Sequence, residues 1–324
     1  MEPNPPTYNN KDDSLNLLTV SNLHVNFPTD VGLVKAVNGV DLSVNSGEVM
    51  GLIGESGCGK SVLGLAITRL LQEDAMIMGD ITYRGDDIQA LDKEKMRKIR
   101  ARDIGIILQN PGTSLNPVIP IGQQIAEPLV MHRNMKRSAA MEKALSLLER
   151  VKIKDPEKRA KEYPHQYSGG MKERALIAMS LANEPEFIIA DEPTKGLDVT
   201  VKKNIVKLLK EISDKKTMLI ITHDLAVAED VCDKVGVMYA GELVEIASAN
   251  NMFQEQLHPY TKGFFESLPS RGLKAIKGHS PSLINLPDGC RFHSRCEHCM
   301  DRCRKEHPPM VKHSGRHVRC FLYA

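Results

Sequence analysis

The sequence contains no tryptophan, and aromatic residues make up only 4% of its 324 residues. A core or a binding face built on stacked aromatic rings is therefore not expected. The net charge is only +2, so no strong field for nucleic acid or an anionic membrane is evident. No apolar run approaches the length of about 18 residues that a membrane-spanning helix needs. What remains is a globular composition, with 41% hydrophobic and 26% charged residues.

The first residues also lack the apolar stretch of a secretory signal. Residues 1–16 are rich in proline, asparagine and aspartate, which predicts a disordered tail. We therefore expect a cytosolic protein in which any role at a membrane depends on partner proteins.

Strand-like and helix-like segments alternate over residues 17–252, which predicts one α/β domain with a sheet core. Between about residues 110 and 184 the pattern becomes mostly helical and predicts an insertion. Polar groups follow three of the expected strands, and ligands of open α/β sheets bind at such carboxyl ends. The expected strands are Glu48–Ile53, Phe187–Ala190 and Met218–Thr222, and the expected helices are Ser61–Leu71, Ser138–Val151 and Val201–Ile212.

One loop carries a phosphate-binding pattern. Residues Gly54–Ser61 read GESGCGKS, which fits G-x-x-x-x-G-K-[ST] and lies between an expected strand and an expected helix. Lys60 is expected to reach the β- and γ-phosphates of ATP, and Ser61 to ligate Mg²⁺. The start of the following helix adds partial positive charge. Other predicted nucleotide contacts are Gly54, Gly57, Cys58, Gly59 and Val62, with the Cys58 side chain expected to face away from the phosphates.

Side chains at other strand ends suit hydrolysis. Asp191 is expected to hold Mg²⁺, and Glu192 to act as the general base toward the attacking water. A helix N-cap with an acidic first turn is the alternative interpretation of these two acids. Gln109 could reach Mg²⁺ or the water, and His223 could contact the γ-phosphate, although surface glutamines and structural histidines are common.

A second glycine-rich segment, Ser168-Gly169-Gly170, suits either an anion-binding helix start or a plain helix cap. In this order the motifs resemble those of the ATP-binding cassette family over roughly residues 17–250. The resemblance implies a head-to-tail dimer in which each ATP lies between Lys60 of one cassette and Ser168-Gly169-Gly170 of the other. It places Asp198 in the family's D-loop. Phe27 lies nearest to the place of an adenine-stacking aromatic, although a phenylalanine there could equally belong to the core.

Further segments resemble the D-type ATPase subunit of dipeptide and oligopeptide importers. That resemblance implies import of peptides or a related solute, powered through two transmembrane permease subunits and a second nucleotide-binding subunit. It also implies an extracellular solute-binding protein as an indirect partner, a peripheral place at the cytoplasmic face of the membrane, and permease docking at about residues 109–135. The segments are Gln109–Pro117, His165–Lys172, Met238–Gly241, His258–Thr261 and Gly289–His293.

The alternative function is a soluble cassette ATPase that is not coupled to transport. Such proteins commonly carry two cassettes in one chain or a long coiled-coil insertion, and the sequence contains neither. Nucleic acid is not an expected partner at a net charge of +2.

Five of the seven cysteines lie in the last 35 residues. They fall in a proline-rich segment, residues 253–324, which predicts an irregular extension with little core, stapled by a metal. The family resemblance implies a [4Fe–4S] cluster there, while nearby histidines leave zinc as a second interpretation. We expect a structural staple rather than a redox sensor, because nothing in the sequence shows a redox partner. The implied ligands are Cys290, Cys296, Cys303 and Cys320, with Cys299 as a possible alternate.

Overall fold

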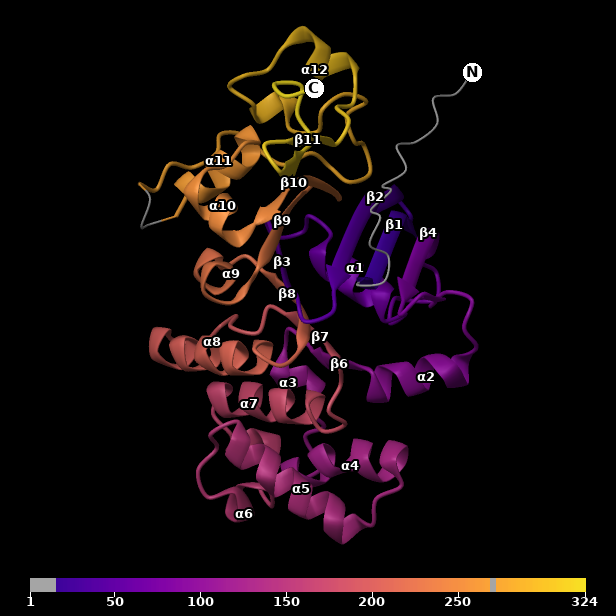
Figure 1. Cartoon of the computed structure of the whole chain (residues 1–324), viewed down its shortest axis with the longest axis vertical. Helices are drawn as coiled ribbons and strands as arrows, with labels where there is room; N and C mark the ends of the chain where they lie inside the picture. Colours follow the sequence, from indigo (N-terminus) through magenta and orange to yellow (C-terminus); the bar gives the residue numbers. More distant parts are fainter. Residues whose placement is uncertain (1–15, 269–271) are drawn as a thin grey trace.

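The computed structural model describes residues 16–268 and 272–324, and in this part of the chain the strands form two sheets (Figure 1). The predicted disordered tail, residues 1–16, lies outside the described residues except for Asn16. The larger sheet has the order β11 (Val311–His313), β12 (Arg316–Val318), β10 (Glu242–Ser248), β9 (Lys234–Tyr239), β3 (Val49–Ile53), β8 (Thr217–Thr222), β7 (Phe187–Asp191) and β6 (Ile104–Ile107). The smaller sheet has the order β2 (Gly32–Asn45), β1 (Asn16–Thr29), β4 (Met76–Tyr83) and β5 (Asp86–Asp87).

Helices connect and cover these strands. Those of the first half are α1 (Lys60–Ile67), α2 (Lys93–Arg102), α3 (Pro111–Ser114), α4 (Ile121–Arg133), α5 (Arg137–Arg150) and α6 (Pro156–Arg159). Those of the second half are η1 (Pro164–Gln166), α7 (Gly169–Ser180), α8 (Val199–Ser213), α9 (Leu225–Val231), α10 (Ala249–Gln254), α11 (Pro259–Glu266), η3 (His293–Arg295) and α12 (Asp301–Lys305). The predicted strands and helices are all confirmed, within a few residues at each end.

The centre of the larger sheet is parallel, from β9 through β3, β8 and β7 to β6. Its strands are apolar on both faces because each face is covered. In β8, Leu219 and Ile221 enter the core shared with the smaller sheet and α1, whereas Met218 and Ile220 enter the core formed with the helices. Alternate side chains of one strand therefore hold two layers together.

The segment predicted to be a helical insertion, about residues 110–184, contains α3 to α7 between β6 and β7. Its helices pack on one another through small and apolar residues, such as Ala140, Ala144 and Leu148 on one face of α5. Figure 1 places α4, α5 and α6 at one end of the molecule and the C-terminal extension at the other. Among the described residues, no helix has both the length and the apolar character to cross a membrane.

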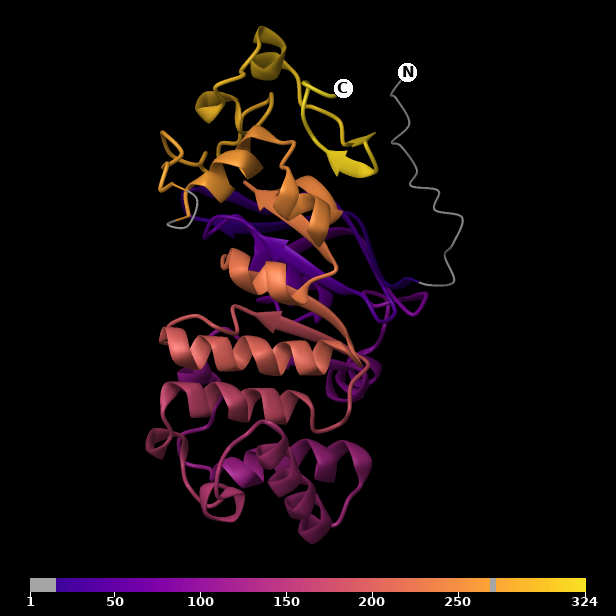
Figure 2. The same ribbon diagram turned by 60° about the vertical axis from the view of Figure 1, so that its left-hand side comes forward.

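The C-terminal extension is more regular than predicted. Strand β12 pairs antiparallel with β10, and the β11–β12 hairpin thereby lengthens the larger sheet. Tyr260 and Phe265 of α11 are buried in the main core. Figure 2 shows the orange helices α10 and α11 and the yellow C-terminal hairpin together at that end. The expectation of an irregular extension with little core was therefore wrong for these elements.

Candidate functional site

The loop after β3 is pressed closely against neighbouring backbone. Gly59 has φ +103°, and a Cβ there would lie 2.2 Å from the Ala36 carbonyl oxygen. A Cβ on Gly54 would lie 2.2 Å from the Met238 carbonyl oxygen. Only glycine has no Cβ to clash at these positions, so the two glycines allow the loop to lie closely between β2 and the end of β9.

Lys60 begins α1 and is buried, with only 5% of its surface exposed. Its Nζ donates to the carbonyl oxygens of Gly54 (2.8 Å) and Glu55 (2.9 Å). These acceptors are neutral, so a phosphate would attract the ammonium group more strongly. The Cys58 side chain is buried beside Lys60, and burial raises the pKa of its thiol, which favours the predicted unreactive side chain.

Ser61 and Asp191 lie side by side although they are 130 residues apart. The Ser61 hydroxyl donates to Asp191 Oδ1 at 3.0 Å. Burial raises the pKa of the Asp191 carboxyl, and the neighbouring Glu192 raises it further. A hydroxyl and a carboxylate placed together in this way are oxygen ligands of the kind that Mg²⁺ prefers.

Glu192 and His223 form the second close pair. Glu192 Oε2 lies 2.7 Å from Nδ1 of His223, which is half exposed, while Glu192 is only 6% exposed. Glu192 has φ +51°, an unusual conformation for a residue other than glycine. Its backbone N–H donates to the Ile221 carbonyl at 2.8 Å, which holds the residue in this conformation. Such strain is found where side-chain placement matters to function.

The sheet order brings these groups to one edge. Strands β3, β8, β7 and β6 are consecutive and parallel, and their carboxyl ends lead into Gly54, His223, Asp191-Glu192 and Gln109, respectively. Gln109 is half-buried and lies two residues beyond Ile107, the last residue of β6. The structure thus groups the polar residues that the sequence predicted at strand ends.

The glycine-rich segment Ser168-Gly169-Gly170 lies elsewhere in the chain. Ser168 caps α7 by accepting a hydrogen bond from Met171 N at 3.4 Å, and Ser168 and Gly169 are exposed. Helix α7 packs against α3, α4, α5, α8 and β6, and Figure 1 shows it in the helical half, away from α1. Within one chain, this segment is therefore not part of the phosphate-loop site.

Three further predicted site residues have clear structural surroundings. Asp198 caps α8, and its Oδ1 accepts from Thr200 N and Val201 N, both at 3.0 Å. Phe27 pairs with Val34 across β1 and β2, two positions from Ala36, which approaches the phosphate loop. Val62 is half-buried in α1 and packs on the core shared with the smaller sheet.

Two contacts between the phosphate loop and the C-terminal extension were not predicted from the sequence. Glu55, at a variable position of the motif, forms an ion pair with Arg295 from the extension (3.1 Å). The Tyr260 hydroxyl accepts from Glu55 N at 2.9 Å. Glu55 lies within the predicted phosphate loop, and Tyr260 lies in the segment His258–Thr261 that carries the family resemblance, but no contact between the two was predicted.

The four cysteines implied as cluster ligands line a single enclosed cavity, which Cys299 does not line. Burial raises the pKa of Cys290 to about 12 and that of Cys320 to about 11, so both are neutral thiols at pH 7 without a cation. Among the described residues, no three His, Cys, Asp or Glu side chains are arranged to hold a metal ion. Neither zinc nor an iron–sulfur cluster thus has a formed ligand group among the described residues, and the predicted metal staple is not supported as a fold feature.

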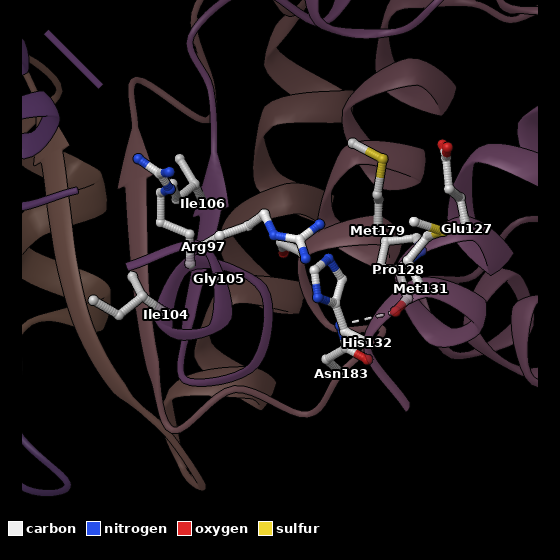
Figure 3. A pocket seen from close by; sticks show the side chains of 12 residues that line it. Arg97, Ile104, Gly105, Ile106, Glu127, Pro128, Met131, His132, Met179 and Asn183 are labelled. Carbon is white, nitrogen blue, oxygen red and sulfur yellow. Dashed lines mark hydrogen bonds between the residues drawn. The ribbon is translucent and has the colours of Figure 1, made fainter. Parts of the chain in front are cut away.

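A separate pocket of about 440 Å³ opens between α2, β6, α4 and α7 (Figure 3). Its lining includes Arg97, Glu127, Met131 and His132, and none of the predicted nucleotide contacts. It therefore does not belong to the phosphate-loop site.

Comparison with known proteins gives matches over nearly the whole chain. The family described as ABC transporter matches residues 37–195, and the oligopeptide/dipeptide transporter C-terminal region matches residues 244–303. The oligopeptide transport ATP-binding protein AppD of Bacillus subtilis is 44% identical, covering 95% of this chain and 97% of that protein. OppD of Escherichia coli, also an oligopeptide transport ATP-binding protein, is 42% identical, covering 94% and 93%.

Solved structures resemble the cassette part. A dimeric ATP-binding cassette in a post-hydrolysis state with ADP and phosphate has a TM-score of 0.66 and 27% identity, covering 72% of this chain and 99% of that one. A Clostridium perfringens cassette that is part of an ABC transporter complex has a TM-score of 0.63 and 28% identity, covering 74% and 92%.

Proposed function

Because the chain belongs to the ATP-binding subunits of peptide-importing ABC transporters, in which ATP hydrolysis is coupled to import, we propose that its phosphate loop and strand-end residues form the ATP site. The observation that carries this assignment is that Ser61 contacts Asp191, and Glu192 contacts His223, at the same edge of the larger sheet where the loop begins at Gly54. Oxygen ligands, a carboxylate base and a phosphate cradle occupy one place, as phosphoryl transfer to water requires.

Each side chain has a defined task in this site. Lys60 leaves the carbonyls of Gly54 and Glu55 to bind the β- and γ-phosphates. Ser61 and Asp191 would hold Mg²⁺, which when bound neutralises charge that develops on the phosphates. Gln109, at the end of the neighbouring strand, is suited to the same metal or to the attacking water.

Glu192 accepts a proton from the water as its oxygen attacks the γ-phosphorus and the bond to the leaving ADP oxygen breaks. The His223 ring, 2.7 Å from Glu192 Oε2, orients that carboxylate and reaches toward the γ-phosphate from its exposed side. Phe27 is proposed to stack on the adenine, and the support is that its strand partner Val34 is two positions from Ala36, which approaches the loop.

A second cassette completes the site. The exposed Ser168 and Gly169 at the start of α7 are distant from the phosphate loop of their own chain, so they suit the ATP held by a partner. Asp198 lies at the start of α8, which packs against α7. At this place it would contact the partner cassette in the closed dimer. The partner cassette has either the same or a related sequence.

The permease subunits are proposed to dock on about residues 109–135. This segment contains two strongly exposed apolar side chains, Val118 (76%) and Met131 (60%). Met131 also lines the pocket in Figure 3, where α4 meets α2 and β6. Apolar surface of this kind is typical of a protein interface. Docking there would hold the chain at the cytoplasmic face of the membrane and link it indirectly to a solute-binding protein.

A soluble ATPase that is not coupled to transport accounts less well for the chain. The match to the oligopeptide/dipeptide transporter C-terminal region, residues 244–303, lies outside the nucleotide site and favours a peptide importer.

Substitution of the proposed base tests the site. Glu192→Gln should lower kcat by about 100- to 10,000-fold, the range of a lost general base, while ATP affinity stays within about twofold. With ATP, the variant should elute as a closed dimer in gel filtration. Normal turnover by Glu192→Gln would show that the base is a different residue.

We also propose that Cys290, Cys296, Cys303 and Cys320 hold a [4Fe–4S] cluster. The support is that these four cysteines line one cavity, which Cys299 does not line, and that four cysteines are the usual ligand set of such a cluster. When bound, the cluster supplies iron–thiolate bonds that tie the segment around Cys303 to Cys320, beyond β12. The role is that of a structural staple.

Anaerobic purification tests the cluster directly. The wild-type chain and Cys299→Ser should be brown and contain about four iron and four sulfide per chain, whereas Cys303→Ser should lose both. Zinc, or thiols without metal, in the wild-type chain would contradict the proposal without affecting the ATP site.

A further inference from the structure

The C-terminal extension contacts the phosphate loop through a buried ion pair. Two guanidinium nitrogens of Arg295, Nη1 and Nη2, donate to Oε2 and Oε1 of Glu55, respectively, both at 3.1 Å. The Arg295 side chain is 6% exposed and that of Glu55 is 28% exposed. A bidentate contact with this much burial fixes both side chains and is far stronger than an exposed ion pair.

Every nitrogen of Arg295 has a partner. Its Nε donates to the Lys277 carbonyl (3.2 Å), and Nη1 also donates to the hydroxyls of Ser280 (3.1 Å) and Tyr239 (3.3 Å). The guanidinium carbon lies 5.8 Å from the centres of the Tyr239 and Phe292 rings. The arginine is thus held in place by the extension and by Tyr239 of β9 in addition to its contact with the loop.

Glu55 has further hydrogen-bond partners at its side chain and at its backbone. Ser280 donates to its carboxylate at 2.6 Å, and its N–H donates to the Tyr260 hydroxyl at 2.9 Å. Its carbonyl accepts from Lys60 Nζ at 2.9 Å, so the residue that Arg295 fixes also holds the lysine. A shift of Glu55 would therefore displace the resting position of Lys60 and the loop that begins at Gly54.

We propose that Arg295 is a positioning residue for the nucleotide: it holds Glu55, and through it the phosphate loop, in the shape that receives the phosphates. The extension is in this sense part of the ATP site. The inference rests on the proposed role of Gly54–Ser61 as that site. The reason for the effect is preorganisation, because a loop that is already shaped loses less freedom on binding.

The test measures ATP affinity of the full-length chain by calorimetry, together with KM, kcat and melting temperature. Arg295→Gln should raise the dissociation constant for ATP about tenfold, because the released Glu55 and its loop then lose more conformational freedom on binding. Arg295→Lys keeps the positive charge but cannot make the bidentate contact, so its dissociation constant for ATP should lie between those of the wild type and Arg295→Gln. Arg304→Gln, in an exposed position of the same extension, is the matched control and should bind ATP as the wild type does.

A double-mutant cycle separates this role from general stabilisation. Glu55→Gln and Arg295→Gln should each weaken ATP binding, and the double variant should be no weaker than the worse single one. If Arg295→Gln does not fold, Glu55→Gln and Arg295→Lys test the same contact. Unchanged ATP affinity in the folded Arg295 variants, or additive losses in the cycle, would overturn the inference.

Lys60→Ala distinguishes this inference from the assignment on which it rests. Loss of ATP binding in Lys60→Ala with unchanged binding in Arg295→Gln would refute the positioning role alone. Undiminished binding in Lys60→Ala would refute the phosphate-loop site itself.

Discussion

At the scale of single residues, Glu173 of α7 is unusual because its carboxyl is buried although it has no role in the proposed mechanism. It is 2% exposed, and its Oε1 has no hydrogen-bond partner among the described residues. Burial raises the pKa of its carboxyl from 4.5 to about 8. The neutral acid is therefore favoured in the folded chain, and ionisation there costs free energy.

This shift predicts a pH-dependent stability. A pKa raised on folding gives stability that is complete below about pH 4.5 and is lost as the pH rises through about 8. Glu173→Gln removes the ionisation and should stabilise the chain by about 1–3 kcal/mol at pH 9, with a smaller effect at pH 5. Urea unfolding at the two pH values measures it, with the exposed Glu149→Gln as control. A gain that is equal at both pH values would show that Glu173 does not ionise in this range.

The residues at strand ends were predictable because local patterns mark them. Gly54–Ser61 is a motif, and Asp191, Glu192 and His223 directly follow apolar runs. The contact between Arg295 and Glu55 was not predictable, since 240 residues separate them and no sequence motif contains both. Contacts of this kind depend on the tertiary structure alone.

At the scale of elements, α8 depends on its first turn. Asp198 accepts two backbone hydrogen bonds there, which gives this residue a capping role beside any role at a dimer interface. Asp198→Ala should lower the free energy of unfolding by about 1 kcal/mol, whereas Asp198→Asn should retain most of it.

Thermal unfolding with an ATPase assay separates the two roles. Asp214→Ala, at the other end of α8, serves as the control. If Asp198→Asn keeps stability but loses ATPase activity, the carboxylate acts at the interface as well as in the cap. Unaltered stability of Asp198→Ala would contradict the capping role.

Elements with long periodic patterns were predictable, and short ones were not. Helices α5 and α8 show repeated apolar positions, and strands β7 and β8 are continuous apolar runs. Strands β11 and β12 have three residues each, too few for a period to show. The abundant prolines nearby then suggested irregular backbone, although β12 pairs with β10.

At the scale of the whole molecule, the two parts of the proposed ATP site lie in different halves of one chain. The phosphate loop lies beside the smaller sheet, and Ser168 begins α7 in the helical half (Figure 1). A chain cannot bring its own two parts together without refolding, so the proposed site predicts that hydrolysis requires two cassettes.

The specific ATPase activity of the isolated chain should therefore rise with its concentration, or should appear only when a second cassette subunit is added. Ser168→Arg should abolish this activity while ATP binding to the single chain persists. Turnover per chain that is independent of concentration down to about 10 nM would indicate a site complete in one copy.

The pairing of β10 with β12 has a consequence for synthesis on the ribosome. Strand β10 ends at Ser248 and its neighbour begins at Arg316, so about 70 residues must still be added before that edge can be covered. At a translation rate of about 5–20 residues per second, the nascent chain carries an open strand edge for several seconds. During that interval the unpaired backbone of β10 is open to strands of other chains, and a chaperone that shields it would raise the yield of folded protein.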